Sequence, residues 1–258
     1  MAATEPLRFR VHPHIVEDLG LNLYTDLPRV LVEFVANAHD ADSPFCHIRM
    51  DVDAIAEQRK LMKAEWEVER KQDELCRLRG DSVPERSPLD ERTLPPQVTI
   101  VIEDHGHGMS RDELENKFLV AGRRRREEEP AGARSEGGRI VMGRKGLGKL
   151  AGFGVAHEVE VVSRRKGEPH ATKVTLVYED LLKHHSTDDI RVPTEILEDG
   201  GGIEPHGTRI TLSRLVYDPV KSRRKTVEHE IGDHFAFVDT NDFAVTMNGD
   251  PVAPTPTG

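Results

Sequence analysis

One stretch, Leu31 to Asp42 with the sequence LVEFVANAHDAD, most constrains what this chain can fold into. If it is helical, Glu33, Asn37 and Asp40 fall on one stripe, because residues four and seven apart share a helix face. A neighbouring stripe is apolar and wide enough to dock the helix on a core, and it contains Val30, Leu31, Phe34, Val35 and Ala38. Taken alone, the pattern is typical of a solvated surface helix. The alternative is a site in which two acids and an amide hold a ligand beside an apolar wall.

Composition indicates a globular protein that carries more charge than one core needs. The 258 residues are 36% hydrophobic and 32% charged, so we expect the excess charge in an insertion or in tails. A formal net charge of −10 argues against whole-domain binding to nucleic acid or to an anionic membrane. No apolar run approaches the roughly 20 residues that span a bilayer. The Pro-rich end, residues 250–258, reads as a linker or an artificial chain end, and we expect the natural protein to continue.

The two cysteines, Cys46 and Cys76, lie far apart in a chain that lacks a secretory signal. We interpret them as reduced, structural thiols of a cytoplasmic protein.

The order of elements predicts an α+β fold, a two-layer sandwich of helices on one face of a mixed, mostly antiparallel sheet. Strict alternation of helix and strand is not sustained, which disfavours a doubly wound parallel sheet. Helices are expected near Ile15–Leu19, from the N-cap Asp26 to about His39, and over Met109–Val120 with Ser110 as N-cap and Glu113 completing a capping box. Strands are expected at Leu7–Val11 as an edge strand, Cys46–Val52, Gln97–Glu103, His157–Ser163, Ala171–Tyr178, Thr208–Leu212 and Phe243–Asn248.

A charged insertion, residues 53–96, interrupts this pattern. Its first part, to Arg79, is helix-prone, and the rest is a return rich in Pro, Ser and charge. Apolar residues at Leu61, Trp66, Leu75 and Leu78 form no clean heptad. A solvated helical arm and a partner-docking or dimerisation arm both remain open.

Two glycine-rich loops follow strong elements. The first, Asp104 to Gly108 (DHGHG), ends the best strand. Gly106 and Gly108 would allow close backbone approach to a flat ligand, and Asp104 offers an acceptor to an exocyclic amine. A plain glycine turn is the alternative.

The second loop is Gly143 to Gly154 (GRKGLGKLAGFG), which we expect to open a small-residue helix. Glycines 143, 146 and 148 suit backbone N–H groups that cradle phosphate, and Lys145 and Lys149 could add charged contacts. The spacing fits neither a P-loop nor a Rossmann fingerprint.

In chain order, ExxxNxxDA at Glu33–Ala41, DxGxGM at Asp104–Met109, GxxGxGK at Gly143–Lys149 and GT at Gly207–Thr208 resemble the four motifs of the GHKL, or Bergerat-fold, ATPase superfamily. That superfamily includes DNA gyrase B, heat-shock chaperone ATPases, MutL, MORC proteins and histidine kinases. The resemblance covers most of the chain. The motif sequences are most similar to those of stand-alone prokaryotic, chaperone-like members. It implies a single ATPase domain over residues 1–258, with an ATP lid at residues 121–142.

The resemblance also implies roles by position. Glu33 would be the general base, Asn37 the ligand of Mg²⁺, and Asp40 a supporting residue. Asp104 would accept from the adenine amine, with Met109 under the base and Thr208 reaching it directly or through water. The remaining implied nucleotide-binding residues are Ala41, Gly106, Gly108, Gly143, Lys145, Gly146, Leu147, Gly148 and Lys149. The run Arg123–Arg126 would either meet phosphate or stay solvated.

Glu33 bears on the expected reaction. Histidine kinases, as the resemblance runs, usually begin this motif with Asn or His, and no helix with a phosphoacceptor histidine precedes the domain here. We therefore expect Mg²⁺-dependent ATP hydrolysis that drives lid closure and a conformational or dimerisation cycle. A nucleotide-sensing module with negligible turnover and a histidine-kinase-type phosphotransferase are the alternatives. His105, His107, His184 and His185 show no metal-ligand spacing and are interpreted as loop residues.

The expected partners are ATP and ADP, with a homodimer on ATP binding. The client and any downstream domains stay unknown, nucleic acid would bind only through other domains, and no membrane is expected.

Overall fold

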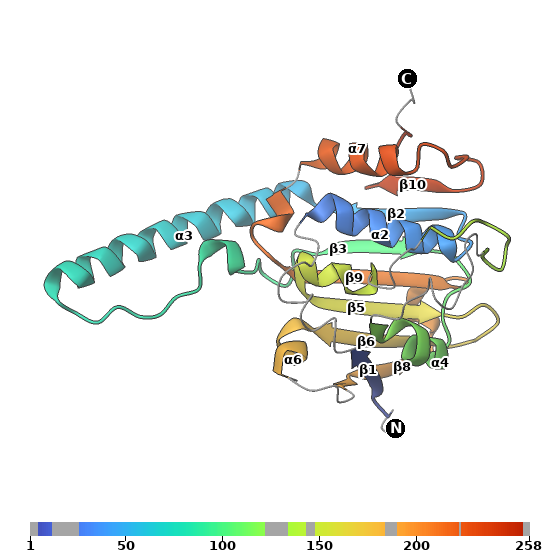
Figure 1. The fold of residues 1–258 in the computed structure, drawn as a ribbon, viewed down its shortest axis with the longest axis horizontal. Helices are drawn as coiled ribbons and strands as arrows, with labels where there is room; N and C mark the ends of the chain where they lie inside the picture. Colours follow the sequence, from blue (N-terminus) through green and yellow to red (C-terminus); the bar gives the residue numbers. More distant parts are fainter. Residues whose placement is uncertain are drawn as a thin grey trace.

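The computed structural model describes residues 5–11, 26–121, 134–142, 148–183, 190–221 and 223–254. Its main sheet has eight strands in the order β11-β10-β2-β3-β9-β5-β6-β8 (Figure 1). Only the β10–β2 pair among these neighbours is parallel. The strands are β2 (Phe45–Met50), β3 (Ile100–Asp104), β5 (Ala156–Arg164), β6 (Ala171–Val177), β8 (Thr194–Leu197), β9 (Gly207–Leu215), β10 (Ala244–Met247) and β11 (Asp250–Pro251). The predicted α+β fold with a mixed, mostly antiparallel sheet is confirmed.

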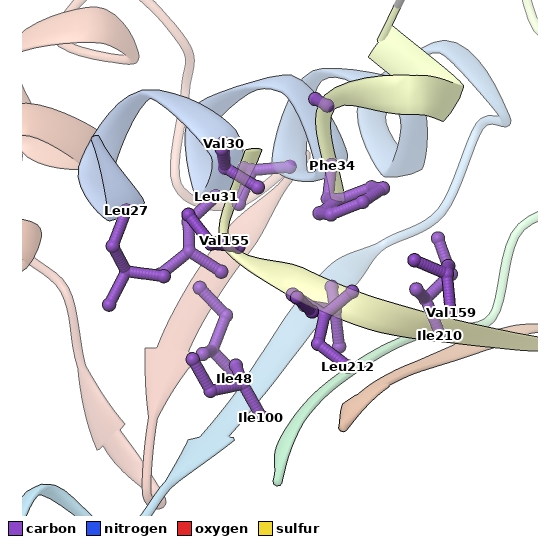
Figure 2. Packing of buried hydrophobic residues seen from close by; sticks show 14 of the residues in the cluster. Leu27, Val30, Leu31, Phe34, Ile48, Ile100, Val155, Val159, Ile210 and Leu212 are labelled. Atoms are coloured by element: carbon purple, nitrogen blue, oxygen red, sulfur yellow. The ribbon is translucent and has the colours of Figure 1, made fainter. Parts of the chain in front are cut away.

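Helix α2 (Leu27–Asp40) covers one face of this sheet. It begins after Asp26, as expected, with proline in its first turn, where the missing N–H costs no hydrogen bond. Leu31 and Phe34 are buried and point from α2 toward sheet residues such as Leu212 (Figure 2). Each fully buried side chain of this size contributes about 1.5–3 kcal/mol. The apolar stripe of the sequence is therefore the docking face of α2.

A second, three-stranded sheet has β1 (Leu7–Val11) at its centre. β1 pairs in parallel with β4 (Val120–Ala121) and antiparallel with β7 (Ile190–Val192). The expectation that Leu7–Val11 is an edge strand is wrong. Both of its partner strands lie more than one hundred residues away in the chain, so no local sequence pattern could predict the pairing.

The expected helix over Met109–Val120 is also wrong in its second half. The capping box of Ser110 and Glu113 is present and opens the short α4 (Arg111–Glu113). The chain then makes one π-helical turn, Leu114–Phe118, and Val120 enters β4 because it pairs with β1. Tertiary pairing therefore ends the helix before its sequence pattern does.

Two strand boundaries differ from expectation for local reasons. β2 stops at Met50, before the expected end at Val52, because Asp51 caps the next helix by accepting from the Ala54 nitrogen at 2.9 Å. β3 begins at Ile100 and includes Asp104, whereas Pro95 and Val98 form a turn.

Helix α3 (Val52–Arg79) confirms the expected charged helical insertion and projects from the domain as an arm (Figure 1). It ends at Gly80, whose φ of 78° suits glycine. At the base of the arm, the Arg59 side chain donates to the Tyr217 carbonyl at 2.8 Å and stacks on its ring. The boundaries of the insertion, lid and C-terminal linker stay predictions.

The remaining elements are short, and the sequence patterns did not predict most of them. They are η1 (Leu89–Glu91), η3 (Gly148–Gly154), α6 (Tyr178–Lys183), η4 (Gly200–Gly202), η5 (Pro219–Lys221) and α7 (Arg224–His234). The expected helix near Ile15–Leu19 lies outside the described residues. In the described part of the chain, no helix has the length and apolar character needed to cross a bilayer.

Candidate nucleotide-binding site

The site begins with the accessible side chains of α2. Ten of the 14 residues of this helix are buried. The four that keep solvent access are Arg29, Glu33, Asn37 and Asp40. Glu33, Asn37 and Asp40 are each only partly exposed, so they line a recessed stripe and not a fully solvated face. Their partial burial therefore disfavours the alternative that this stripe is the solvated face of an ordinary surface helix.

The C-terminal end of α2 meets the DHGHG loop. The His107 nitrogen donates to the Ala41 carbonyl at 2.9 Å. A Cβ on Gly106 would lie 2.5 Å from the same carbonyl oxygen, so the contact requires glycine. This junction joins two motifs that are more than sixty residues apart in the chain.

Asp104 ends β3 and pairs with Thr208 on β9. Its carboxylate accepts a hydrogen bond from the Gly106 nitrogen at 2.8 Å. Desolvation raises the pKa of Asp104 to about 7, against the opposing effect of backbone hydrogen bonds from Gly106 and Thr208. Asp104 is thus a poorly hydrated carboxyl group that can accept further hydrogen bonds.

A buried serine ties the neighbouring motifs together. Ser163, at the end of β5, accepts from the Met109 nitrogen at 2.9 Å and lies 2.9 Å from the Thr208 hydroxyl. Sequence reasoning missed Ser163, because only the register of β5 against β9 places it beside Thr208. The Thr208 hydroxyl, predicted to reach adenine, is engaged with Ser163.

Two further glycines let three backbone segments converge here. Gly108 has a φ of 63°, and a Cβ on it would lie 1.9 Å from the Arg164 carbonyl oxygen. Gly207 has a φ of 143°, and its Cβ would lie 2.1 Å from the Asp104 carbonyl oxygen. Both positions therefore need glycine for the chain's own packing.

The segment Arg134–Met142 docks on the end of α2. The Met142 nitrogen donates to the Asp40 carboxylate at 2.8 Å, and the Gly137 nitrogen donates to Asp42 at 2.6 Å. Arg139, which sequence reasoning also missed, donates to the carbonyls of Ser43 and Asp242, each at 2.6 Å. This end of the predicted lid is therefore held by the C-terminal end of α2 and the residues that follow it.

Several predicted site residues lie outside the described part of the chain, namely Gly143, Lys145, Gly146 and Leu147, as does the run Arg123–Arg126. Gly148 and Lys149 begin η3, and only their backbone is described. η3 is a 3-10 helix where a small-residue helix was expected, and it packs next to α2. His107 hydrogen-bonds to its neighbour Gly108 at 2.7 Å, in keeping with its interpretation as a loop residue.

Comparison with known proteins matches residues 89–219, just over half of the chain, to the family described as histidine kinase-, DNA gyrase B-, and HSP90-like ATPase. The chain belongs to this ATPase family. The match includes the DHGHG loop, the GRKGLGK loop and Gly207–Thr208. It begins after the arm, so α2 lies outside it.

Curated relatives agree with this assignment. A putative type II restriction enzyme, HgiDII, from Herpetosiphon aurantiacus is 33% identical over 60% of this chain and 25% of its own length. Chaperone protein HtpG from Rhizobium meliloti is 33% identical over 58% of this chain and 22% of its own length. HtpG from Mycolicibacterium gilvum is 34% identical over 44% of this chain and 17% of its own length. The chain thus spans a quarter or less of the relatives it matches.

The chemistry of the site fits the nucleotide that this ATPase family binds. Asn37 supplies an oxygen donor of the kind that Mg²⁺ accepts. Among the described residues, no group of three or more His, Cys, Asp or Glu side chains could hold a metal ion.

Proposed function

We propose that this chain is a Mg²⁺-dependent ATPase. Family membership supports ATP binding and an ATPase activity of this type. The observation that carries the proposal is the junction of Ala41 with Gly106, because it brings the C-terminal end of α2, where the polar stripe ends at Asp40, against the loop that contains Asp104.

Each polar group is assigned one role. The Glu33 carboxylate orients a water molecule and accepts its proton as the water attacks. Asn37 helps to hold Mg²⁺, which neutralises phosphate charge when bound. Asp104 accepts a hydrogen bond from the adenine amine in surroundings that exclude competing water. Asp40 supports the site through its contact with Met142.

The other predicted residues complete the assignment. Met109 packs partly buried against the core and would form the apolar wall under the base. Ala41, Gly106, Gly108 and Thr208 shape the adenine side. Gly143, Lys145, Gly146, Leu147, Gly148 and Lys149 would bind the phosphates.

Glu33→Gln tests the reaction. Gln keeps the size of the side chain and removes its basicity, so we expect phosphate release to fall by about 100-fold or more while ATP binding persists. Glu57→Gln, an exposed position on α3, is the matched control and should leave turnover unchanged. Unchanged phosphate release by Glu33→Gln would refute the assignment of the base.

Labelled ATP separates the alternative functions. With protein limiting, an ATPase accumulates ADP and free phosphate over many turnovers. A nucleotide-sensing module binds ATP without producing ADP, and a histidine-kinase-type enzyme leaves the γ-phosphate on protein. Glu33, an acidic residue at the first position of the polar stripe on α2, favours hydrolysis over the other two.

Asp104→Asn tests the binding role independently. We expect ATP affinity in calorimetry to fall by roughly tenfold or more, because a charged acceptor to the adenine amine is lost. Normal affinity would contradict the adenine assignment while leaving that of Glu33 intact.

We further propose that hydrolysis drives lid closure and a dimerisation cycle within a larger, chaperone-like protein of the cytoplasm. The relatives whose names describe a chaperone and a restriction enzyme are four or more times longer than the matched region. The free thiols of Cys46 and Cys76 suit a reducing compartment. Light scattering with and without a non-hydrolysable ATP analogue tests the dimer, and an unchanged mass would count against it.

A further inference from the structure

Helix α3 carries an exposed apolar stripe. Its large exposed hydrophobic residues are Leu61 (50% exposed), Val68 (65%), Leu75 (52%) and Leu78 (79%). Leu61, Val68 and Leu75 recur every seven residues, which is the repeat of one seam position in a coiled coil, and Leu78 takes the second seam position. Trp66, which interrupts this repeat in the sequence, does not belong to the stripe.

The opposite face of α3 is already covered. Trp66 and Asp73 are at least partly buried there, against the returning segment. Arg86 pairs with Asp73 at 3.2 Å, and Arg92 pairs with Glu69 at 2.6 Å. The returning segment thus packs against one face of α3 and leaves the face with the leucine and valine side chains exposed. The arm extends away from the body of the domain (Figure 1), so the stripe is accessible.

Five charged residues and one glutamine flank the stripe in a defined order. Lys60, Glu67 and Glu74 run along one side, and Glu65, Gln72 and Arg79 run along the other. All six are exposed, and the return segment covers none of them. Within the described residues they form no ion pair. These are the positions that meet across a two-stranded coiled coil and select its partner and orientation.

We propose that α3 packs against α3 of a second copy of this chain as a parallel, in-register coiled coil. In that arrangement Lys60 faces Glu65 of the second copy, and Glu74 faces Arg79 of the second copy. Glu67 faces Gln72 without repulsion. By symmetry, each attractive pair occurs twice.

An antiparallel pairing fits less well. Pairing Leu61 with Leu78 of the second copy in opposite directions brings Glu67 opposite Glu74, which repel. Nucleic acid is also a poor occupant, because α3 carries seven acidic and seven basic residues. The self-complementary order of charges therefore points to a second copy.

The predicted coiled coil is short and weak by itself. Its seam spans Leu61 to Leu78, about 26 Å at 1.5 Å per residue. Lys71 and Ala64 occupy seam positions in the same stripe, and a polar seam residue costs stability while fixing the register. A seam this short holds two copies together only weakly, so the test must trap the arm contact covalently.

Disulfide trapping in the full chain tests orientation. In a Cys76→Ser background, Leu61→Cys and Leu75→Cys should each form same-residue crosslinked dimers without nucleotide, because seam positions face themselves in a parallel pair. Lys63→Cys and Arg77→Cys, exposed positions two residues away, are the controls and should crosslink roughly tenfold more slowly. Equal rates at seam and control positions, or a preferred Leu61→Cys to Leu78→Cys crosslink in mixtures, would overturn the proposal.

Charge exchange provides a test that does not alter the seam. Lys60→Glu and Glu65→Lys should each slow Leu75→Cys crosslinking by roughly tenfold, and the double variant should recover the original rate. Circular dichroism confirms that α3 stays helical. A double variant as slow as either single variant would refute the pairing. Neither test depends on ATP hydrolysis, so failure of the proposed function leaves both informative.

Discussion

The Asp40 carboxylate accepts a 2.8 Å hydrogen bond from the backbone nitrogen of Met142, joining the polar stripe of α2 to the end of the predicted lid. Asp40→Ala should remove this bond, while Asp40→Asn should keep it, because the amide oxygen can still accept. We expect hydrogen exchange at the Met142 amide to accelerate by about tenfold in the alanine variant, as for the loss of one hydrogen bond. Equal exchange in both variants would contradict a supporting role for Asp40.

The raised pKa of Asp104 predicts a pH dependence of stability. The folded protein holds a proton on Asp104 up to about pH 7, whereas the unfolded chain releases it near its ordinary pKa of 3.8. The folded state therefore binds more protons between these values, and this group makes the free energy of unfolding fall as pH rises from about 4 to about 7.

Asp104→Asn should remove this penalty. Without ATP, we expect the variant to be more stable than the parent at pH 8, by up to about 4 kcal/mol, and nearly equal to it at pH 4. Urea unfolding at the two pH values measures the difference. The measured quantity is the free energy of unfolding of the variant minus that of the parent. If this difference is smaller at pH 8 than at pH 4, the carboxylate is well solvated or paired.

Gly106→Ala should weaken ATP binding through the junction with Ala41. The added Cβ would meet the Ala41 carbonyl oxygen at 2.5 Å, so the loop must move away from α2 at a cost of about 1–3 kcal/mol. Gly167→Ala is the matched control. Its Cβ meets nothing within 4 Å, although a φ of 88° makes alanine strained there. Both variants should lose stability, and only Gly106→Ala should lose ATP affinity in calorimetry.

The two thiols should differ in reactivity. Cys46 is fully buried, and desolvation, reinforced by the charge of Asp104, raises the pKa of its thiol well above the ordinary value. Cys76 is partly exposed on α3. A thiol reagent at pH 8 should therefore label Cys76 in the native protein and both cysteines after denaturation. Rapid native labelling of Cys46 would indicate that β2 opens readily.

Local patterns predicted the parts of the site that depend on neighbouring residues. The α2 stripe follows from helical periodicity, the start of α4 from the capping box of Ser110 and Glu113, and the turn after β3 from its glycines. The order of four motifs then indicated the family, although each motif alone is a common surface helix or turn.

Other features depended on contacts that no local pattern records. Ser163 becomes part of the site only because β5 and β9 pair in one register, and Arg139 only because its segment folds back onto α2. Likewise, the α3 stripe is defined by the return segment, which covers Trp66 and leaves Leu61, Val68 and Leu75 exposed.

The sequence by itself determined which residues could carry the chemistry and which helix presents them, because periodicity and capping act within a few residues. The tertiary structure alone decided what those residues meet. The pairing of Asp104 with Thr208, the packing of Gly106 on Ala41, and the central place of β1 all join distant segments. Their stability comes from burial and backbone pairing across the whole domain, which the residues on either side of each motif do not encode.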